Sequence, residues 1–153
     1  MSTQGVIVVG ADHRGFHLKE KVKQTLVAEG YTVLDVGAQK MTRTDDYTTY
    51  ARAAARKITK NPAARGILFC GSGIGMSIAA NKMHGVRAGL AATPAQAKAG
   101  RVDDHMNILV VAADTTTHAQ AKRIVAAFLA TTPSAASRHL RRVRTLNRYG
   151  SRA

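Results

Sequence analysis

Short apolar runs alternate with longer amphipathic stretches along the whole chain, and this alternation constrains the fold more than any other feature. The apolar runs predict strands at residues 6–9, 32–36, 66–70, 86–91 and 107–113. The stretches that follow them predict helices at residues 18–26, 50–58, 75–83, from Pro94, at 118–130 and after Pro133. Strands that alternate with helices form right-handed βαβ units. The sequence therefore predicts an α/β fold with a parallel sheet covered by helices on both faces.

Length and composition predict one domain, residues 1–153, in a reducing compartment. A chain of 153 residues with 45% hydrophobic content can bury a single core. One cysteine cannot form an internal disulfide, and no Cys/His cluster has zinc spacing. No apolar run approaches the roughly 18 residues that cross a membrane, and the first residues lack the pattern of a signal peptide. We therefore expect a cytoplasmic protein.

The chain is strongly basic, with 23 Lys and Arg against 9 Asp and Glu and a formal net charge of +14. Such a charge favours nucleic acids or small anions as partners. The stretch "SRHLRRVRTLNRYGSRA" (137–153) is rich in arginine and holds no acid. A solvated helix face followed by a frayed tail is the alternative interpretation of this stretch. Its arginines are Arg138, Arg141, Arg142, Arg144, Arg148 and Arg152.

A glycine-rich turn, "LFCGSGIGMSIAANK" (68–82), follows the third predicted strand. In open parallel sheets, ligands bind beyond the carboxyl ends of the strands, so this turn is a candidate site. Gly71, Gly73 and Gly75 give G-x-G-x-G rather than the dinucleotide fingerprint G-x-G-x-x-G, and no Gly-Lys-Ser/Thr closes the turn. Nucleotide binding is therefore disfavoured.

The same turn suits an anion and a reactive thiol. Successive glycines let backbone N–H groups converge, and the following helix adds the positive end of its dipole. Cys70 lies at the strand end beside that field, which predicts a tendency towards thiolate. A buried structural cysteine in a tight turn is the alternative. "GADHRG" (10–15) brings Asp12 and His13 to another strand end, where they can hydrogen-bond a polyol, although His13 could instead cap a helix.

Several stretches of the chain together resemble the ribose-5-phosphate isomerase B and galactose-6-phosphate isomerase family. They are "GADHRGFHLKEKV" (10–22), "VLDVG" (33–37), "RTDDYTTYA" (43–51), "GILFCGSGIGMSIAANKMHGVRAGLA" (66–91) and "SRHLRRV" (137–143). The resemblance covers nearly the whole chain and implies a Rossmann-like three-layer α/β/α sandwich with a parallel five-stranded sheet. It also implies a homodimer or dimer of dimers with shared active sites, a C-terminal helix that reaches the partner subunit, and neither metal nor nucleotide cofactor.

The resemblance implies aldose–ketose isomerisation of a sugar phosphate through a cis-enediolate. Cys70 matches the family's proton-transfer base and Ser72 the hydroxyl that assists the proton relay. Arg138 and Arg142 match phosphate clamps that reach into the partner's site. The other substrate-binding candidates are Asp12, His13, Tyr47, Gly71, Gly73, Gly75 and Ser77.

The chain departs from the family pattern in "RVDDHMN" (101–107). Asp103 and Asp104 stand where the family has a His that helps to open the sugar ring and an Asn that binds a hydroxyl, so they join the substrate-binding candidates. His105 comes two residues late, and a surface role is favoured for it. Asp114 stands where a further phosphate-binding arginine is expected, and three carboxylates facing a phosphate would repel it.

These departures leave several functions open. The substrate can be a ribose-5-phosphate type sugar, or an acyclic or shorter one such as a tetrulose phosphate. The chain can be a LacB-like subunit of a hetero-oligomeric hexose-6-phosphate isomerase, or a pentose-phosphate isomerase with a rearranged or poorly active site. It can also be a non-catalytic binding protein whose basic tail takes RNA or acidic partners. The intact cysteine–glycine loop argues against the last account, and so does a tail whose one aromatic residue is Tyr149.

Overall fold

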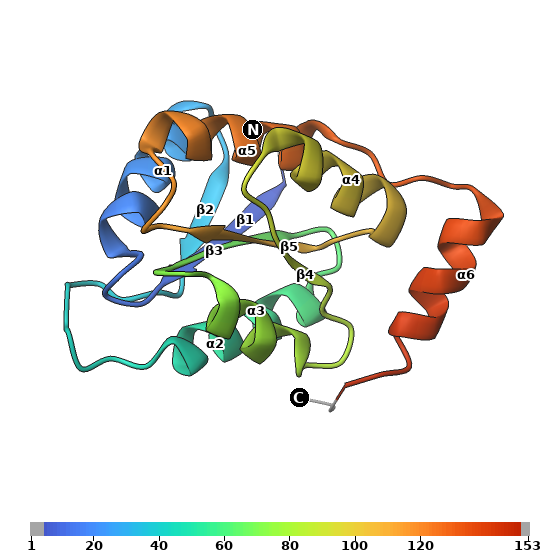
Figure 1. Ribbon diagram of the computed structural model, residues 1–153, viewed down its shortest axis with the longest axis horizontal. Helices are drawn as coiled ribbons and strands as arrows, with labels where there is room; N and C mark the ends of the chain where they lie inside the picture. Colours follow the sequence, from blue (N-terminus) through green and yellow to red (C-terminus); the bar gives the residue numbers. More distant parts are fainter. Residues whose placement is uncertain (1–4, 151–153) are drawn as a thin grey trace.

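In the computed structural model, which describes residues 5–150, the chain forms five strands and six helices. Neighbouring strands pair in parallel in the order β2-β1-β3-β5-β4 (Figure 1). The elements are β1 (Val6–Ala11), α1 (Phe16–Ala28), β2 (Thr32–Asp35), α2 (Tyr47–Lys60), β3 (Arg65–Cys70), α3 (Ile74–Asn81), β4 (Ala88–Leu90), α4 (Pro94–Asp104), β5 (Ile108–Ala112), α5 (His118–Ala130) and α6 (Ser137–Leu146). The predicted α/β fold with a parallel sheet is confirmed.

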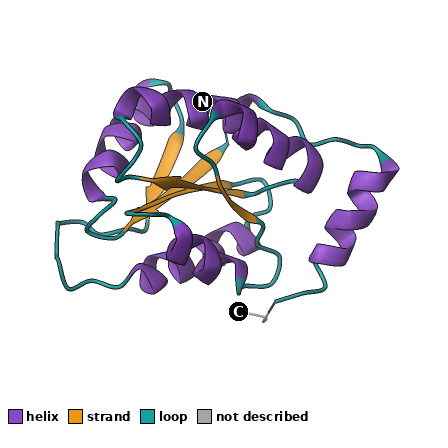
Figure 2. Ribbon diagram, in the orientation of Figure 1, coloured by secondary structure: helices purple, strands orange, loops and turns teal. Residues whose placement is uncertain are grey.

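Helices cover both faces of the sheet (Figure 2). Ile67 and Phe69 of β3 pack into one core with α1, α4 and α5, whereas Leu68 and Cys70 pack into the other with α2 and α3. Because both faces of β3 are covered, its sequence is a continuous apolar run rather than an alternating one. Within residues 5–150, no helix is both long and apolar enough to cross a membrane.

Helix α6 lies outside these layers and projects from the body beyond α4 (Figure 1). Its buried residues are His139 and Val143. His139 Nδ1 lies 3.1 Å from the carbonyl oxygen of Asp103, at the end of α4. The arginines of α6 are exposed. The helix therefore packs against the body through His139 and Val143, and its basic face is open to solvent.

Two element boundaries differ from the predicted ones for local reasons. Helix α2 begins at Tyr47, before the predicted residue 50, because the Asp46 side chain accepts a hydrogen bond from Thr48 N at 2.9 Å and caps the helix. Strand β4 is shorter than the predicted 86–91. The Arg87 N–H donates to the side chain of Asn107 at 2.8 Å instead of to a strand carbonyl.

A buried charge attaches α1 to β2. Lys19 is fully buried, and its Nζ donates to Asp35 Oδ2 at 2.8 Å and to the Ala38 carbonyl at 2.7 Å. Lys23 Nζ donates to the same Asp35 oxygen at 2.7 Å. Burial acts to raise the pKa of Asp35, but the hydrogen bonds from Lys19 and Lys23 outweigh it and lower that pKa. The carboxylate of Asp35 therefore stabilises the junction between α1 and β2.

Candidate active site

The ends of β1 and β3 bring Cys70 and Asp12 into contact. These strands pair in parallel, with Ala11 opposite Phe69, so the next residues, Asp12 and Cys70, lie side by side at the carboxyl ends of the two strands. The Cys70 thiol donates to Asp12 Oδ2 at 3.3 Å. Asp12 Oδ1 accepts the backbone N–H groups of Arg14 and Gly15, each at 3.1 Å, which fixes the carboxylate. Both side chains are buried, so the two predicted loops meet in one sheltered place.

The environment of Cys70 keeps its thiol protonated, which corrects the expected tendency towards thiolate. Burial, the charge of Asp12 and the hydrogen bond to Asp12 raise the pKa of Cys70 to about 11. Backbone hydrogen bonds from Gly73 and Gly71 lower the pKa of Cys70, as expected beside a helix N-terminus, but their effect is smaller than that of burial and Asp12. Cys70 is thus a neutral donor to a carboxylate in the unliganded site.

The glycine-rich turn has a shape that side chains would disrupt. Gly73 takes a left-handed conformation with φ of +75° and caps the start of α3. A Cβ at Gly75 would lie 2.7 Å from Tyr47 Cζ, so the Tyr47 ring lies directly against the turn. Ser72 is exposed at its tip, where Oγ accepts the Ile74 N–H at 3.3 Å. Tyr47 therefore lies against the turn that follows Cys70, and Ser72 lies within that turn.

His13 is oriented by a residue that sequence reasoning did not single out. Its Nδ1 lies 2.7 Å from Asp45 Oδ1, and its backbone N–H donates to the same oxygen at 3.1 Å. Tyr50 Oη donates to Asp45 Oδ2 at 3.2 Å. The first residue of α1 is preceded by Gly15 with no side-chain cap, so the alternative role of His13 as a helix cap is wrong. Asp45 lay inside the stretch "RTDDYTTYA", and its acidic side chain was the available signal.

Arg14 is a second residue that sequence reasoning missed. It follows His13 in "GADHRG", and its guanidinium forms an ion pair with Asp114 and lies against Gly71. Asp114 N also donates to the Gly71 carbonyl at 3.1 Å. The carboxylate that stood in place of an expected arginine is therefore paired with an arginine from another loop.

Ser77 and His105 lie outside the cluster of contacts around Cys70. The Ser77 N–H donates to the Gly73 carbonyl at 3.0 Å, and its buried Oγ has no hydrogen-bond partner within residues 5–150. His105 ends α4 with a φ of +50°, and its Nε2 lies 2.8 Å from the Ser134 carbonyl oxygen. His105 is half-buried and thus holds the segment before α6, rather than having the surface role that was expected for it.

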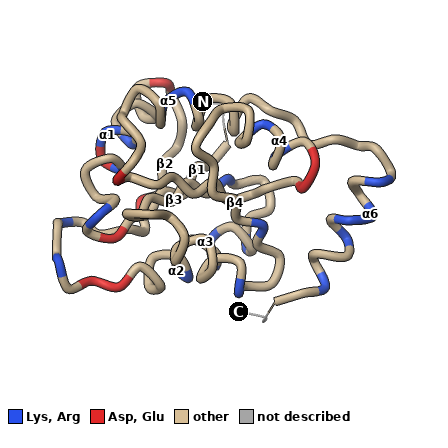
Figure 3. The backbone as a smooth tube through the Cα atoms, viewed as in Figure 1, with Lys and Arg blue, Asp and Glu red and all other residues tan. Residues whose placement is uncertain are grey.

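The remaining candidates do not join Cys70 within the same chain. Helix α4 runs back from the carboxyl ends of the strands, so Asp103 and Asp104 at its end lie towards the amino ends of the strands. Figure 3 shows this acidic end of α4 next to α6. Asp103 Oδ1 is 3.7 Å from His139 Nδ1. Arg138 and Arg142 are exposed on α6, which projects away from the end of β3 (Figure 1).

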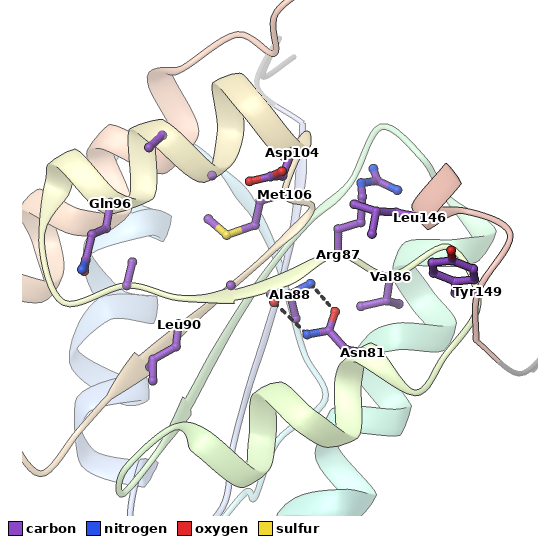
Figure 4. A pocket seen from close by; sticks show the side chains of 14 residues that line it. Asn81, Val86, Arg87, Ala88, Leu90, Gln96, Asp104, Met106, Leu146 and Tyr149 are labelled. Carbon is purple, nitrogen blue, oxygen red and sulfur yellow. Dashed lines mark hydrogen bonds between the residues drawn. The ribbon is translucent and has the colours of Figure 1, made fainter. Parts of the chain in front are cut away.

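A groove of about 620 Å³ lies where β4, α4 and α6 face one another (Figure 4). Its lining includes Leu90 on the edge strand, Asp104 and Met106 near the end of α4, and Leu146 and Tyr149 from the α6 segment. Leu90, Leu146 and Tyr149 are exposed, which leaves apolar surface beside the basic helix. This groove is separate from Cys70.

No group of three or more His, Cys, Asp or Glu side chains within residues 5–150 could hold a metal ion.

Comparisons with known proteins agree on one family. A family model described as Ribose/Galactose Isomerase matches residues 7–146. Ribose-5-phosphate isomerase B of Mycobacterium tuberculosis is 36% identical over 143 residues, which cover 94% of this chain and 88% of that protein.

Solved structures give the same result. Ribose 5-phosphate isomerase of Thermotoga maritima is 39% identical, with a TM-score of 0.89 over 96% of this chain and 99% of that one. Ribose-5-phosphate isomerase B of Mycoplasma genitalium, solved with bound ribulose-5-phosphate, is 32% identical, with a TM-score of 0.91 over 96% of this chain and 97% of that one.

Proposed function

Because the chain belongs to the ribose/galactose isomerase family, and so to the aldose–ketose isomerases, we propose that it interconverts ribose 5-phosphate and ribulose 5-phosphate, or a shorter sugar phosphate of the same type, through Cys70. The observation that carries this proposal is the contact between the Cys70 thiol and Asp12 at 3.3 Å, beside the glycine-rich turn. The relative that binds ribulose-5-phosphate supports a five-carbon substrate.

The proposed reaction moves one proton between neighbouring carbons. Cys70 Sγ takes the proton from the carbon next to the carbonyl, and the electrons of that C–H bond form the double bond of an enediolate. The carbonyl oxygen takes the negative charge beside the backbone N–H groups of residues 71–75. The sulfur then returns the proton to the other carbon. Ser72, exposed at the tip of the turn, moves the hydroxyl proton between the two oxygens.

Asp12 has a defined part in this scheme because the thiol must lose its own proton first. A thiol is a poor base, and thiolate is the reactive form. The thiol already donates to Asp12 Oδ2, so the carboxylate is the acceptor in place to take that proton. We therefore treat Cys70 and Asp12 as one proton-transfer pair.

We further propose that a second copy of the chain completes the site. Arg138 and Arg142 are exposed on the projecting α6. Asp103 and Asp104 lie towards the amino ends of the strands, whereas Cys70 lies at a carboxyl end. The groove between β4, α4 and α6 offers apolar surface for the partner (Figure 4). In a homodimer, these residues would reach the partner's Cys70 site. A hetero-oligomer with a different isomerase subunit is the alternative.

The experiment is a substrate screen on the purified protein with four-, five- and six-carbon aldose phosphates. We expect turnover of a five-carbon or shorter phosphate by the chain alone. Turnover of a hexose 6-phosphate that requires an added second subunit would support the hetero-oligomer instead. No turnover in any combination, with a folded protein, would refute the isomerase proposal.

Cys70→Ala tests the base. We expect this variant to lose turnover and the exchange of substrate carbon-bound hydrogen with solvent, because no other thiol exists in the chain. Mass spectrometry in deuterated water measures the exchange, and circular dichroism checks folding. Exchange at the wild-type rate in Cys70→Ala would assign the base to another residue.

A further inference from the structure

The glycine at position 71 leaves room for a guanidinium group. A Cβ at Gly71 would collide with Arg14 Cζ, Nε and Nη1, so the head of Arg14 occupies the space that a side chain at this position would take. Arg14 Nη2 donates to Asp114 Oδ2 on the loop after β5. Gly71 is the neighbour of Cys70 in the chain, so Arg14 places a permanent positive charge next to the reactive turn.

A basic cleft of about 400 Å³ opens beside Arg14. His17 and Lys21 lie one turn apart on α1, and His118 comes from the start of α5. Among the described residues that line the cleft, every ionisable side chain is basic and none is acidic. Its polar lining is Arg14, His17, Lys21, His118, Thr116 and Thr117.

The loop after β5 fixes this cleft to the Cys70 turn. Ala113 N donates to the Cys70 carbonyl at 2.8 Å, and Asp114 N donates to the Gly71 carbonyl at 3.1 Å. Ala113 also lines the cleft. The cleft and the reactive turn therefore share one rigid junction at the carboxyl end of β3.

We propose that the cleft is an anion subsite that binds a phosphate group, with Arg14 as the ligand that the same chain supplies in addition to the proposed clamps on α6, and with Asp114 as the residue that positions Arg14. This proposal rests on the proposed function in taking the substrate's own phosphate as the bound group. Arginine binds phosphate through two parallel N–H donors, and threonine hydroxyls and further cations complete such a site. Arg14 is exposed by 54%, so its remaining donors are open to a ligand.

The pairing explains how a carboxylate is tolerated where the family resemblance implied an arginine. Asp114 alone would repel a phosphate dianion, but its charge is compensated by Arg14. The guanidinium reaches the same junction from the loop after β1 instead of from the loop after β5.

The test compares Arg14→Met with Arg123→Met, which removes an exposed arginine of α5 outside the cleft. We expect Arg14→Met to raise KM for the sugar phosphate about tenfold or more, with a small change in kcat, because it removes a charge-assisted hydrogen bond to a remote group. Asp114→Asn should raise KM by a smaller factor at unchanged kcat. Arg123→Met should match the wild type. Arg14→Met with wild-type KM would overturn the proposal.

Titration with inorganic phosphate identifies the source of the bound group. Competitive inhibition that is lost in Arg14→Met assigns the cleft to the substrate's phosphate. Non-competitive inhibition that is lost in Arg14→Met assigns it to a free phosphate at the same cleft. Inhibition that is unchanged in Arg14→Met refutes the site.

Calorimetry separates this inference from the proposed function. If the wild type binds phosphate and Arg14→Met does not, the subsite stands even where no sugar phosphate is turned over. If both proteins bind phosphate equally while the wild type is an active isomerase, the subsite fails and the function stands. The Arg14–Asp114 pair is exposed and contributes little to folding, so Arg14→Met should remain folded.

Discussion

At the scale of single residues, Cys70 lies at the proposed active site, but its thiol is protonated at ordinary pH. Its pKa is raised to about 11 by burial, by the charge of Asp12 and by the hydrogen bond to Asp12. The N-terminus of α3 is close enough to lower that pKa through Gly71 and Gly73, yet it does not prevail. In the proposed mechanism, the carboxylate that accepts the thiol hydrogen bond is also the group that takes the thiol proton.

Asp12→Asn should lower the pKa of Cys70 below about 11, because it removes the charge that disfavours the thiolate. The amide oxygen can still accept the N–H groups of Arg14 and Gly15, so the turn should keep its shape. The rate of alkylation by iodoacetamide as a function of pH measures the titration, since the chain has one cysteine. We expect faster alkylation at pH 8 together with slower isomerisation.

Asp45→Asn is the matched control, because it removes a carboxylate that contacts His13 and not Cys70. It should leave the thiol titration unchanged. An identical titration in Asp12→Asn would mean that Asp12 does not set the state of the thiol.

At the scale of elements, the ion pairs of Asp35 hold α1 against β2. Lys19 has no exposed surface, and Asp35 is its carboxylate partner on β2, at 2.8 Å. Removing one partner of a buried pair leaves the other charge buried, which costs more than the pair contributes. This junction also anchors the start of α1, next to the loop that carries Asp12, His13 and Arg14.

Asp35→Asn should reduce the free energy of unfolding by up to about 3 kcal/mol at pH 7, because Lys19 Nζ then keeps Glu20 Oε1, at 3.0 Å, as its remaining carboxylate partner. The folded-state pKa of Asp35 lies below its ordinary value of 3.8, so its contribution is fully present above about pH 4 and is lost as the pH falls through the folded pKa. The difference between wild type and variant should therefore shrink in acid. Urea unfolding at pH 7 and pH 3 measures it. Glu29→Gln, at the exposed end of α1, should change stability little, and equal effects of both variants would contradict the assignment.

At the scale of the whole molecule, the chain separates Cys70 and Asp12, the proposed proton-transfer pair, from the cluster of arginines on α6. Figure 3 shows the basic residues along α6 on the far side from the end of β3. A site that needs both must draw them from two copies, and two-fold symmetry then builds two such sites at once.

Mixing two inactive variants tests this shared site. Cys70→Ala lacks the proposed base and Arg142→Ala a proposed phosphate clamp, so each homodimer should be impaired. Random exchange of subunits should yield hybrids with one intact site, and about a quarter of the wild-type activity should return. Activity after mixing and subunit exchange at matched concentration measures this. Activity equal to the mean of the separate variants would show that each chain uses its own residues.

The sequence predicted the fold well because its signals are local. The run Arg65–Cys70 followed by glycines identifies a strand end, and the rules of parallel sheets bring that end beside Asp12. Boundaries that depend on side chains from elsewhere were less predictable. Asn107, the residue before β5, accepts the Arg87 N–H and so shortens β4, and no pattern within residues 86–91 reveals this.

The chemistry of the site was less predictable than its location. Arg14 and Asp114 are separated by 100 positions, so their pairing appears only in the fold. The pKa of Cys70 depends on how far burial and Asp12 outweigh two backbone donors, and the sequence, which left a buried cysteine open as an alternative, could not decide that balance. The role of Asp45 follows from its contacts in the fold, where its carboxylate oxygens hydrogen-bond to His13 and Tyr50.

The buried, protonated state of Cys70 also bears on how long the protein survives. Thiolates that solvent can reach attack peroxides and disulfides and are oxidised, and this sulfur belongs to a residue that is 7% exposed and stays neutral at ordinary pH. An oxidant in solvent therefore meets a sheltered, protonated thiol, whereas in the proposed mechanism a bound sugar meets a thiol whose proton already has an acceptor. In the proposed mechanism, the contact with Asp12 that prepares Cys70 for a substrate also slows the oxidation of its thiol.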